Sequence, residues 1–316
     1  MDKRTRVFNA MDKKEVDHVP VGFWYHFSGE EAQGERCVQA HLDFYRETDA
    51  DIIKIMSDGF YPYPITAKIE KASDWYNLKP LGKDHPYIQG QVWRAKRIQE
   101  EVGGECALFY NIFPAFSQLR FELGDELVMQ HLREDKDAVL SALEMVTQDT
   151  VSLVEQVITE AKMDGVYCSV QAAELWRFSY EEYREIVTPA DLKVINRANE
   201  LSDYNILHFC GWAGDKNRLE VWRDYPGKTV NWAVHVEDLS MEQGREYFGG
   251  RCCLGGFANT RPAPIFYGTK KEIADFTHGL INSFGKTGLI IGADCTIPAE
   301  VSNERMAWVV EAARQI

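Results

Sequence analysis

Short apolar segments alternate with segments of helical pattern along the chain, and this alternation constrains the fold more than any other feature. Strands joined through helices run parallel, because a crossover helix returns the chain to the same edge of the sheet. Eight such units in 316 residues predict a (β/α)8 barrel, whose C-terminal strand ends surround one mouth. An open doubly wound sheet is the alternative, and no glycine-rich phosphate-binding motif supports it. The eight expected strands cover residues 19–24, 51–56, 106–112, 165–170, 205–210, 229–234, 252–257 and 288–293.

Helices are expected between these strands, with extra N-terminal helices near the first two. The chain has no internal repeat and no low-complexity linker, so one domain over residues 1–316 is expected. The expected helices cover residues 4–15, 31–48, 67–99, 119–131, 136–162, 179–201, 215–223, 240–248, 270–284 and 298–314.

Charge and cysteine content restrict the partners and the compartment. A net charge of −14 argues against binding to nucleic acid or to an anionic membrane, because either needs a basic face. No apolar run approaches the length of a membrane span, and the charged N-terminus lacks a secretory apolar region. Seven cysteines at scattered spacings then suggest free thiols in a reducing cytoplasm.

The strongest candidate for a metal site is His208 with Cys210 and Cys295. His208 and Cys210 lie two positions apart at the end of one expected strand, so both side chains point the same way. Cys295 follows the last expected strand, whose end lies on the same mouth of a barrel. Two thiolates and one imidazole suit zinc, and three protein ligands leave a fourth position open for a substrate. The alternative is a buried free cysteine beside a core histidine.

Acidic and histidine side chains at other strand ends are candidates for general acid or base. Glu174 and His235 each follow an expected strand, and either is a candidate for a fourth ligand or a base. Asp58, at the second strand end, is a candidate for holding a cationic or NH-bearing substrate. Each of the three has an ordinary alternative as a helix cap, a solvated group or a turn residue.

Aromatic residues are concentrated at or beyond the expected strand ends. Aromatic side chains at a barrel rim predict an apolar pocket for a flat or methyl-bearing ligand. The polar residue Asn111 ends the third expected strand among them. The candidate substrate-binding residues are Trp24, Tyr61, Asn111, Phe113, Trp176 and Trp232.

Several motifs of the chain resemble those of the uroporphyrinogen decarboxylase superfamily. The resemblance covers nearly the whole chain and implies a distorted (β/α)8 barrel. The motifs that carry it are residues 6–11 with 17–21, 208–211 (His-Phe-Cys-Gly), the glycine pair 255–256, 267–272 and 292–298.

The superfamily contains cofactor-free decarboxylases of a tetrapyrrole and zinc-dependent methyltransferases that work with a corrinoid protein. Decarboxylases carry an arginine-rich segment after the first strand, where this chain has the arginine-free residues 23–28. Asp58 matches the decarboxylase aspartate, whereas Cys295 stands where decarboxylases have a histidine.

The methyltransferases of the superfamily bind zinc through a His-x-Cys motif and a distant cysteine, which His208, Cys210 and Cys295 match. The resemblance therefore implies a zinc-dependent methyltransferase that moves a methyl group between a corrinoid protein and a thiol or a methylated small molecule. Its expected cofactors are zinc and a methylcobamide on the partner protein, and a homodimer is an open alternative for assembly. Uroporphyrinogen decarboxylase and a non-catalytic corrinoid- or tetrapyrrole-binding protein remain the alternative functions.

Overall fold

The apolar segments form one curled sheet of seven parallel strands in a computed structural model that describes residues 1–316. Each strand pairs with the next one along the chain, and every strand residue is buried. Strands buried on both faces are typical of a parallel sheet covered by helices, so the predicted α/β barrel class is confirmed. The strands are β1 (Ile52–Ile55), β2 (Ala107–Ile112), β3 (Gly165–Val170), β4 (Ile206–Phe209), β5 (Thr229–Trp232), β6 (Cys252–Phe257) and β7 (Leu289–Ala293).

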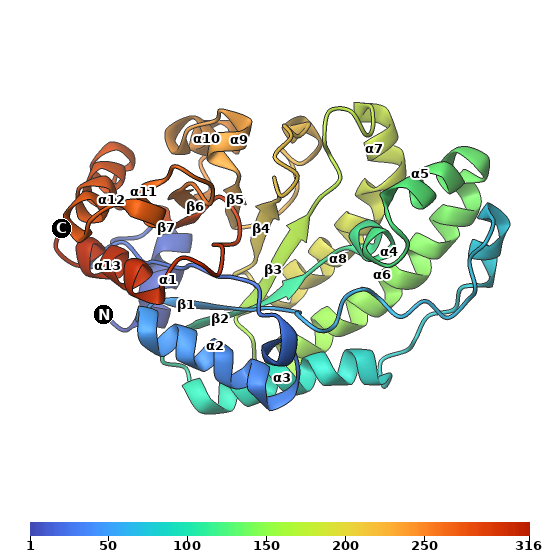
Figure 1. Ribbon diagram of the computed structural model, residues 1–316, viewed down its shortest axis with the longest axis horizontal. Helices are drawn as coiled ribbons and strands as arrows, with labels where there is room; N and C mark the ends of the chain where they lie inside the picture. Colours follow the sequence, from blue (N-terminus) through green and yellow to red (C-terminus); the bar gives the residue numbers. More distant parts are fainter.

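Helices surround this sheet, with α12 and α13 near both chain termini and α5 and α6 at the opposite end (Figure 1). Capping boxes at Ser179, Ser240 and Thr269 fix the starts of α7, α10 and α12. The α-helices are α1 (Lys3–Met11), α2 (Gly34–Thr48), α3 (Pro86–Val102), α4 (Ala115–Leu123), α5 (Asp125–Glu134), α6 (Lys136–Thr159), α7 (Tyr180–Ile186), α8 (Thr188–Leu201), α9 (Val234–Glu237), α10 (Met241–Tyr247), α11 (Pro264–Tyr267), α12 (Lys270–Phe284) and α13 (Asn303–Ala313). Single 3-10 turns are η1 (Gly29–Ala32), η2 (Ala72–Asn77) and η3 (Leu219–Val221).

Residues 19–24, the expected first strand, do not form a strand. This segment, called the seam below, lies between β1 and β7, the two edge strands of the sheet. Its backbone exchanges hydrogen bonds of 2.8 Å with Ile291 of β7, which form one isolated parallel bridge at Val21. Toward β1, the Val21 carbonyl accepts from the Asp51 N–H, and the Val21 N–H donates to the Asp51 carboxylate, both at 2.8 Å. Seven strands form where eight were predicted. Toward β1, the Asp51 carboxylate accepts the hydrogen bond that a main-chain carbonyl would accept in a sheet.

Three helix predictions need correction. The helix expected over residues 67–99 begins only at Pro86 in α3, and before it the chain forms only the turn η2. The helix expected over residues 215–223 is only the turn η3, because Lys216 and Arg218 already bond through their backbones to Leu175 and Ala173. The helix expected over residues 119–131 is divided into α4 and α5 at Gly124, whose φ of +83° is open to glycine and strained for other residues.

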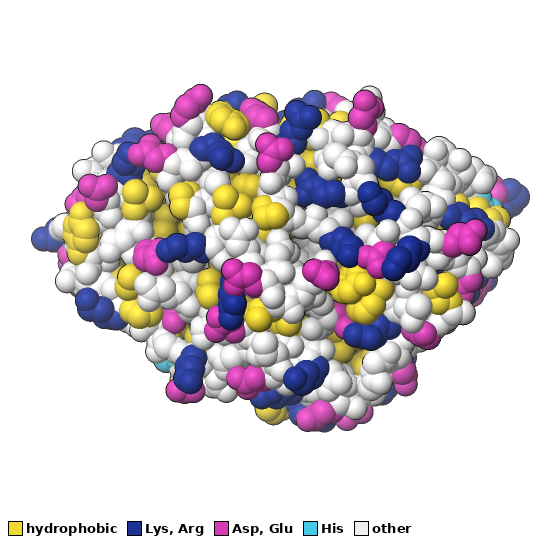
Figure 2. Space-filling view, turned by 180° about the vertical axis from the view of Figure 1, so that it is seen from behind, with side chains coloured by type: hydrophobic (Ala, Val, Ile, Leu, Met, Phe, Trp, Pro, Cys, Tyr) yellow, Lys and Arg dark blue, Asp and Glu magenta, His cyan; other side chains and the backbone are white.

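The core is one contiguous cluster of 90 buried apolar residues around the sheet. None of the helices combines the length and the apolar character that crossing a bilayer requires. On the face in Figure 2, acidic and basic side chains are interspersed with small apolar areas. This mixture is typical of a solvent-exposed surface.

Candidate metal centre and pocket

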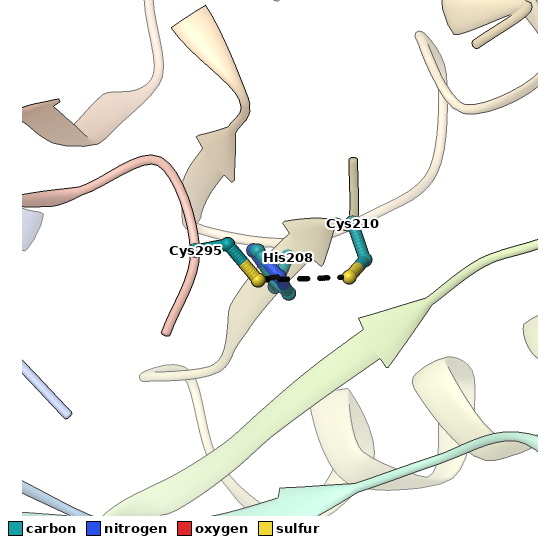
Figure 3. A group of neighbouring side chains, drawn as sticks. All are labelled: His208, Cys210 and Cys295. Carbon is teal, nitrogen blue, oxygen red and sulfur yellow. Dashed lines mark hydrogen bonds between the residues drawn. The ribbon is translucent and has the colours of Figure 1, made fainter. Parts of the chain in front are cut away.

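The side chains of His208, Cys210 and Cys295 meet at the mouth of the sheet (Figure 3). His208 lies in β4 and Cys210 directly follows it, so strand alternation points both the same way. Cys295 lies two residues beyond β7. The curvature of the sheet brings this loop over β4, although β4 and β7 are not paired. The structure therefore brings together the three side chains that the sequence pattern grouped.

Their spacing matches what one tetrahedral zinc ion needs. The two sulfur atoms are 3.8 Å apart, and the Cys295 sulfur is 3.5 Å from His208 Nε2. Tetrahedral zinc, with bonds of ~2.3 Å to sulfur and ~2.0–2.1 Å to nitrogen, separates two sulfurs by about 3.8 Å and sulfur from nitrogen by about 3.6 Å. All three ligand atoms lie within 4.8 Å of one another. The residues present therefore fit zinc, and both cysteines are free of disulfide bonds.

Asn231 of β5 fixes the orientation and tautomer of the His208 ring. Its Nδ2 donates to the carbonyls of Leu254 and Ala293 at 2.9 and 3.0 Å, so its Oδ1 must face His208 Nδ1. An amide oxygen only accepts, so Nδ1 carries the proton. The lone pair of Nε2 is then directed toward the cysteines, as metal ligation requires.

The two thiols differ in acidity because they share a proton. A hydrogen bond from Cys295 lowers the pKa of Cys210 and raises that of Cys295. The Gln171 side chain adds to this effect, because its Nε2 donates to the Cys210 sulfur at 3.5 Å. Cys210 is therefore the first of the pair to become a thiolate, which is the form that binds metals.

Replacing Asn231 with leucine is expected to weaken zinc binding by about 10–100-fold, the usual effect of removing a partner of a metal ligand. The His208 Nδ1–H would lose its acceptor, and the ring could rotate. Competition with a chelating dye measures the affinity. Asn111→Leu is the matched control, because Asn111 is equally buried but bonds to Ser57 and Ser169 instead. An equal loss in both variants would indicate general destabilisation and contradict the prediction.

A pocket of about 280 Å³ opens above the three ligands. Its volume is near the lower end of pockets that hold small molecules, roughly 300–1,000 Å³. Tyr61, Phe113 and Phe121 pack against one another on one wall. The main apolar lining residues are Trp24, Met56, Tyr61, Phe113, Phe121 and Trp212. The pocket therefore offers an apolar cavity whose inner end carries the candidate metal ligands.

Lys54 also lines this pocket, and it is absent from the predicted site residues. Its ammonium lies 4.2 Å from the centre of the Trp24 ring and 3.9 Å from that of Tyr167. Burial lowers the pKa of Lys54 to about 7, although the thiols Cys295 and Cys210 act in the opposite direction. The sequence signal that could have identified Lys54 is its position among the isoleucines of a buried strand, Ile52–Ile55. A cation buried there needs specific partners, as in a functional site.

Asp58 lies beneath another wall of the pocket, with both carboxylate oxygens in use. Oδ2 accepts from the Phe27 N–H at 2.7 Å, and Oδ1 accepts from His26 Nδ1 at 2.7 Å and the Tyr61 hydroxyl at 2.9 Å. Burial raises the pKa of Asp58, but these hydrogen bonds outweigh it and hold the pKa below the usual range. Asp58 therefore holds His26 and Tyr61, which line the pocket, and does not line it itself.

The structure separates the predicted substrate-binding residues into two groups. Trp24, Tyr61 and Phe113 line the pocket, whereas Asn111 lies behind it and bonds to Ser169 of the lining. Trp232 was expected to bind substrate but lies outside the pocket. It follows the inward-facing Asn231, so its side chain points outward and packs on Phe248. Trp176 is exposed, donates to Asp215 and is not part of the pocket lining.

The predicted acid or base candidates Glu174 and His235 also lie outside the pocket lining. Glu174 is buried and pairs with Arg177 at 2.7 Å, so its charge is already compensated. His235 is half-buried, and its Nδ1 lies 2.8 Å from the Asp294 carboxylate. Neither side chain is placed to complete the cluster of His208, Cys210 and Cys295.

Residues 59–316 of the chain match the family model of uroporphyrinogen decarboxylase (URO-D). No curated protein matches the sequence of the chain. Among solved structures, a methyltransferase from Methanosarcina mazei is similar at a TM-score of 0.79 with 15% sequence identity, and the match covers 100% of this chain and 99% of that one.

Two further similar structures carry methionine synthase names. One is a B12-independent methionine synthase from a Shewanella species, with a TM-score of 0.57 and 12% identity over 94% of this chain and 97% of that one. The other is a putative vitamin-B12-independent methionine synthase from Listeria monocytogenes, with a TM-score of 0.52 and 10% identity over 88% and 85%. At these identities the likeness shows a shared fold.

Proposed function

The chain belongs to the uroporphyrinogen decarboxylase family, and within it we propose a zinc-dependent methyltransferase that moves a methyl group between a corrinoid protein and a thiol or a methylated small molecule. The observation that carries this proposal is the spacing of His208, Cys210 and Cys295, which fits tetrahedral zinc. Zinc bound there would supply a Lewis acid with an open position facing the pocket.

The chain's own residues supply binding and orientation in this proposal. Asn231 holds the His208 ring, and Gln171 contacts Cys210. The apolar lining excludes water from the end of the pocket that holds the thiols. Two thiolates compensate the charge of one zinc ion, so the centre does not repel an anionic substrate atom.

In this proposal the corrinoid stays on a partner protein, because the pocket is too small to hold it. A corrin ring is far larger than a cavity of about 280 Å³, so the methyl group would be delivered at the mouth. The exposed ring of Trp212, which lines the pocket, offers contact area for a carrier protein.

The decarboxylase alternative is less well supported by the pocket. No arginine lines it, and Lys54 is its one lysine, whereas a substrate with eight carboxylates needs several cations. Both carboxylate oxygens of Asp58 already accept hydrogen bonds from groups of the same chain, so neither is available to a pyrrole NH. The surroundings of Asp58 therefore favour a structural and orienting role.

The test is zinc content together with methyl transfer from methylcobalamin to 2-mercaptoethanol. Protein purified under reducing conditions is expected to carry about one zinc per chain. Chelation should abolish transfer, and added zinc should restore it. Full activity without metal would overturn the proposal, metal-free conversion of uroporphyrinogen would establish the decarboxylase, and cobalamin binding without transfer would favour a binding protein.

A further inference from the structure

His26 stands at the pocket with one ring nitrogen fixed and the other free. Its Nδ1 lies 2.7 Å from Asp58 Oδ1, and a carboxylate only accepts, so Nδ1 carries a proton. Nε2 then keeps its lone pair for a ligand. The His26 side chain is 39% exposed, whereas that of Asp58 is 1% exposed. A buried carboxylate that orients a partly exposed imidazole is the arrangement of a histidine base.

Resting on the proposed function, we propose that His26 is the catalytic base of the reaction, with Nε2 accepting the proton of the acceptor thiol while Asp58 and Tyr61 position the ring. His26 lines the same pocket as Cys210 and Cys295. Its exposed face gives the proton a route to solvent. This wall of the pocket then handles the proton of the acceptor thiol.

The proposed methyl transfer balances in protons and in electrons. The thiol S–H bond breaks, its proton passes to His26 Nε2, and the electron pair stays on sulfur. That pair forms the new bond to the methyl carbon, while the Co–C bond of the methylated corrinoid breaks and leaves its pair on cobalt. The Asp58 carboxylate stabilises the imidazolium, so His26 keeps the proton while the thiolate is bound and passes it to solvent only after methyl transfer.

Lys54 is the rival base, and its position argues against it. Its Nζ lies against the rings of Trp24 and Tyr167, and the side chain is buried, so it exchanges a proton with solvent less readily than the partly exposed His26. The groups in contact with the His26 ring are Asp58 and Tyr61, and the other ionisable groups of the pocket are Lys54, His208 and the two thiols.

The test counts protons and does not depend on turnover. Zinc-loaded protein is titrated calorimetrically with 2-mercaptoethanol at pH 7.5 in two buffers of different ionisation enthalpy. Wild type should release clearly less than one proton per thiol bound, because His26 retains it. His26→Gln should release about one, because metal coordination takes the thiolate. Asp58→Asn should change the count in the same direction.

His235→Gln is the matched control, because His235 pairs with Asp294 in the same way outside the pocket and should behave as wild type. Where methyl transfer is observed, His26→Gln should also lower its rate on the order of 10²–10⁴-fold. Equal proton release by wild type and His26→Gln would overturn the role of His26, even in an active methyltransferase. A change seen in Lys54→Met alone would assign the proton to Lys54. Protein that binds neither zinc nor thiol would overturn both proposals.

Discussion

Cys295→Ser is expected to lose zinc and, with it, methyl transfer. Serine nearly preserves the size of the side chain, but its hydroxyl does not ionise near neutral pH and cannot replace a thiolate. Apparent zinc-binding free energies of ~10–16 kcal/mol over four ligands correspond to roughly 3 kcal/mol per ligand, or on the order of 100-fold in affinity. Metal analysis after gel filtration and a chelator titration measure the loss.

Cys253→Ser provides the matched control for this prediction. Cys253 is a free, fully buried cysteine of β6 that lies outside the metal cluster. Any loss of stability from placing a hydroxyl in the core should therefore appear in Cys253→Ser without loss of zinc. Zinc retained by Cys295→Ser at wild-type affinity would contradict the assignment of the ligands.

The metal cluster was predictable because each half follows from local sequence. His208 and Cys210 share a face by strand alternation, and Cys295 needs only the rule that parallel strand ends gather at one mouth. Neither inference requires knowing which residues pair between neighbouring strands.

The directions in which Asn231 and Trp232 point could not be predicted from local sequence. The register pairs His208 with Asn231 and Phe209 with Trp232, so Asn231 faces the ligand and Trp232 faces α10. A shift of one residue would exchange them, and the sequence alone does not fix the register. The partner of His208 was therefore missed, and Trp232 was wrongly placed in the pocket.

His26 was missed for a different reason. It follows residues 19–24, which have the composition of a strand but form only one bridge. Its place in the pocket depends on Asp58, a residue 32 positions away that a pattern search treats separately. Contacts between loops of different units carry no periodic signal in the sequence.

Asp51→Ala is expected to lower the free energy of unfolding by about 3–5 kcal/mol, the usual cost of removing one partner from a buried ion pair. The Asp51 side chain is fully buried and lies 2.6 Å from Arg6 Nη1. The substitution would leave the Arg6 charge short of a partner and the Val21 N–H without its acceptor. Urea unfolding measures the change, and Asp17→Ala is the control, because Asp17 pairs with the same arginine near the surface and should cost about 1 kcal/mol or less.

The same substitution should also weaken zinc binding, although Asp51 is not in the metal cluster. The seam that Asp51 holds continues to Trp24, whose carbonyl accepts from the Ile297 N–H at 2.8 Å, two residues beyond Cys295. The Trp24 ring also lies 5.8 Å from the ring of His208, measured between centroids. Loosening the seam therefore disturbs two ligands at once, whereas Asp17→Ala leaves the seam intact. Equal zinc affinity in Asp51→Ala and wild type would mean that the cluster is held by β4 and β7 alone.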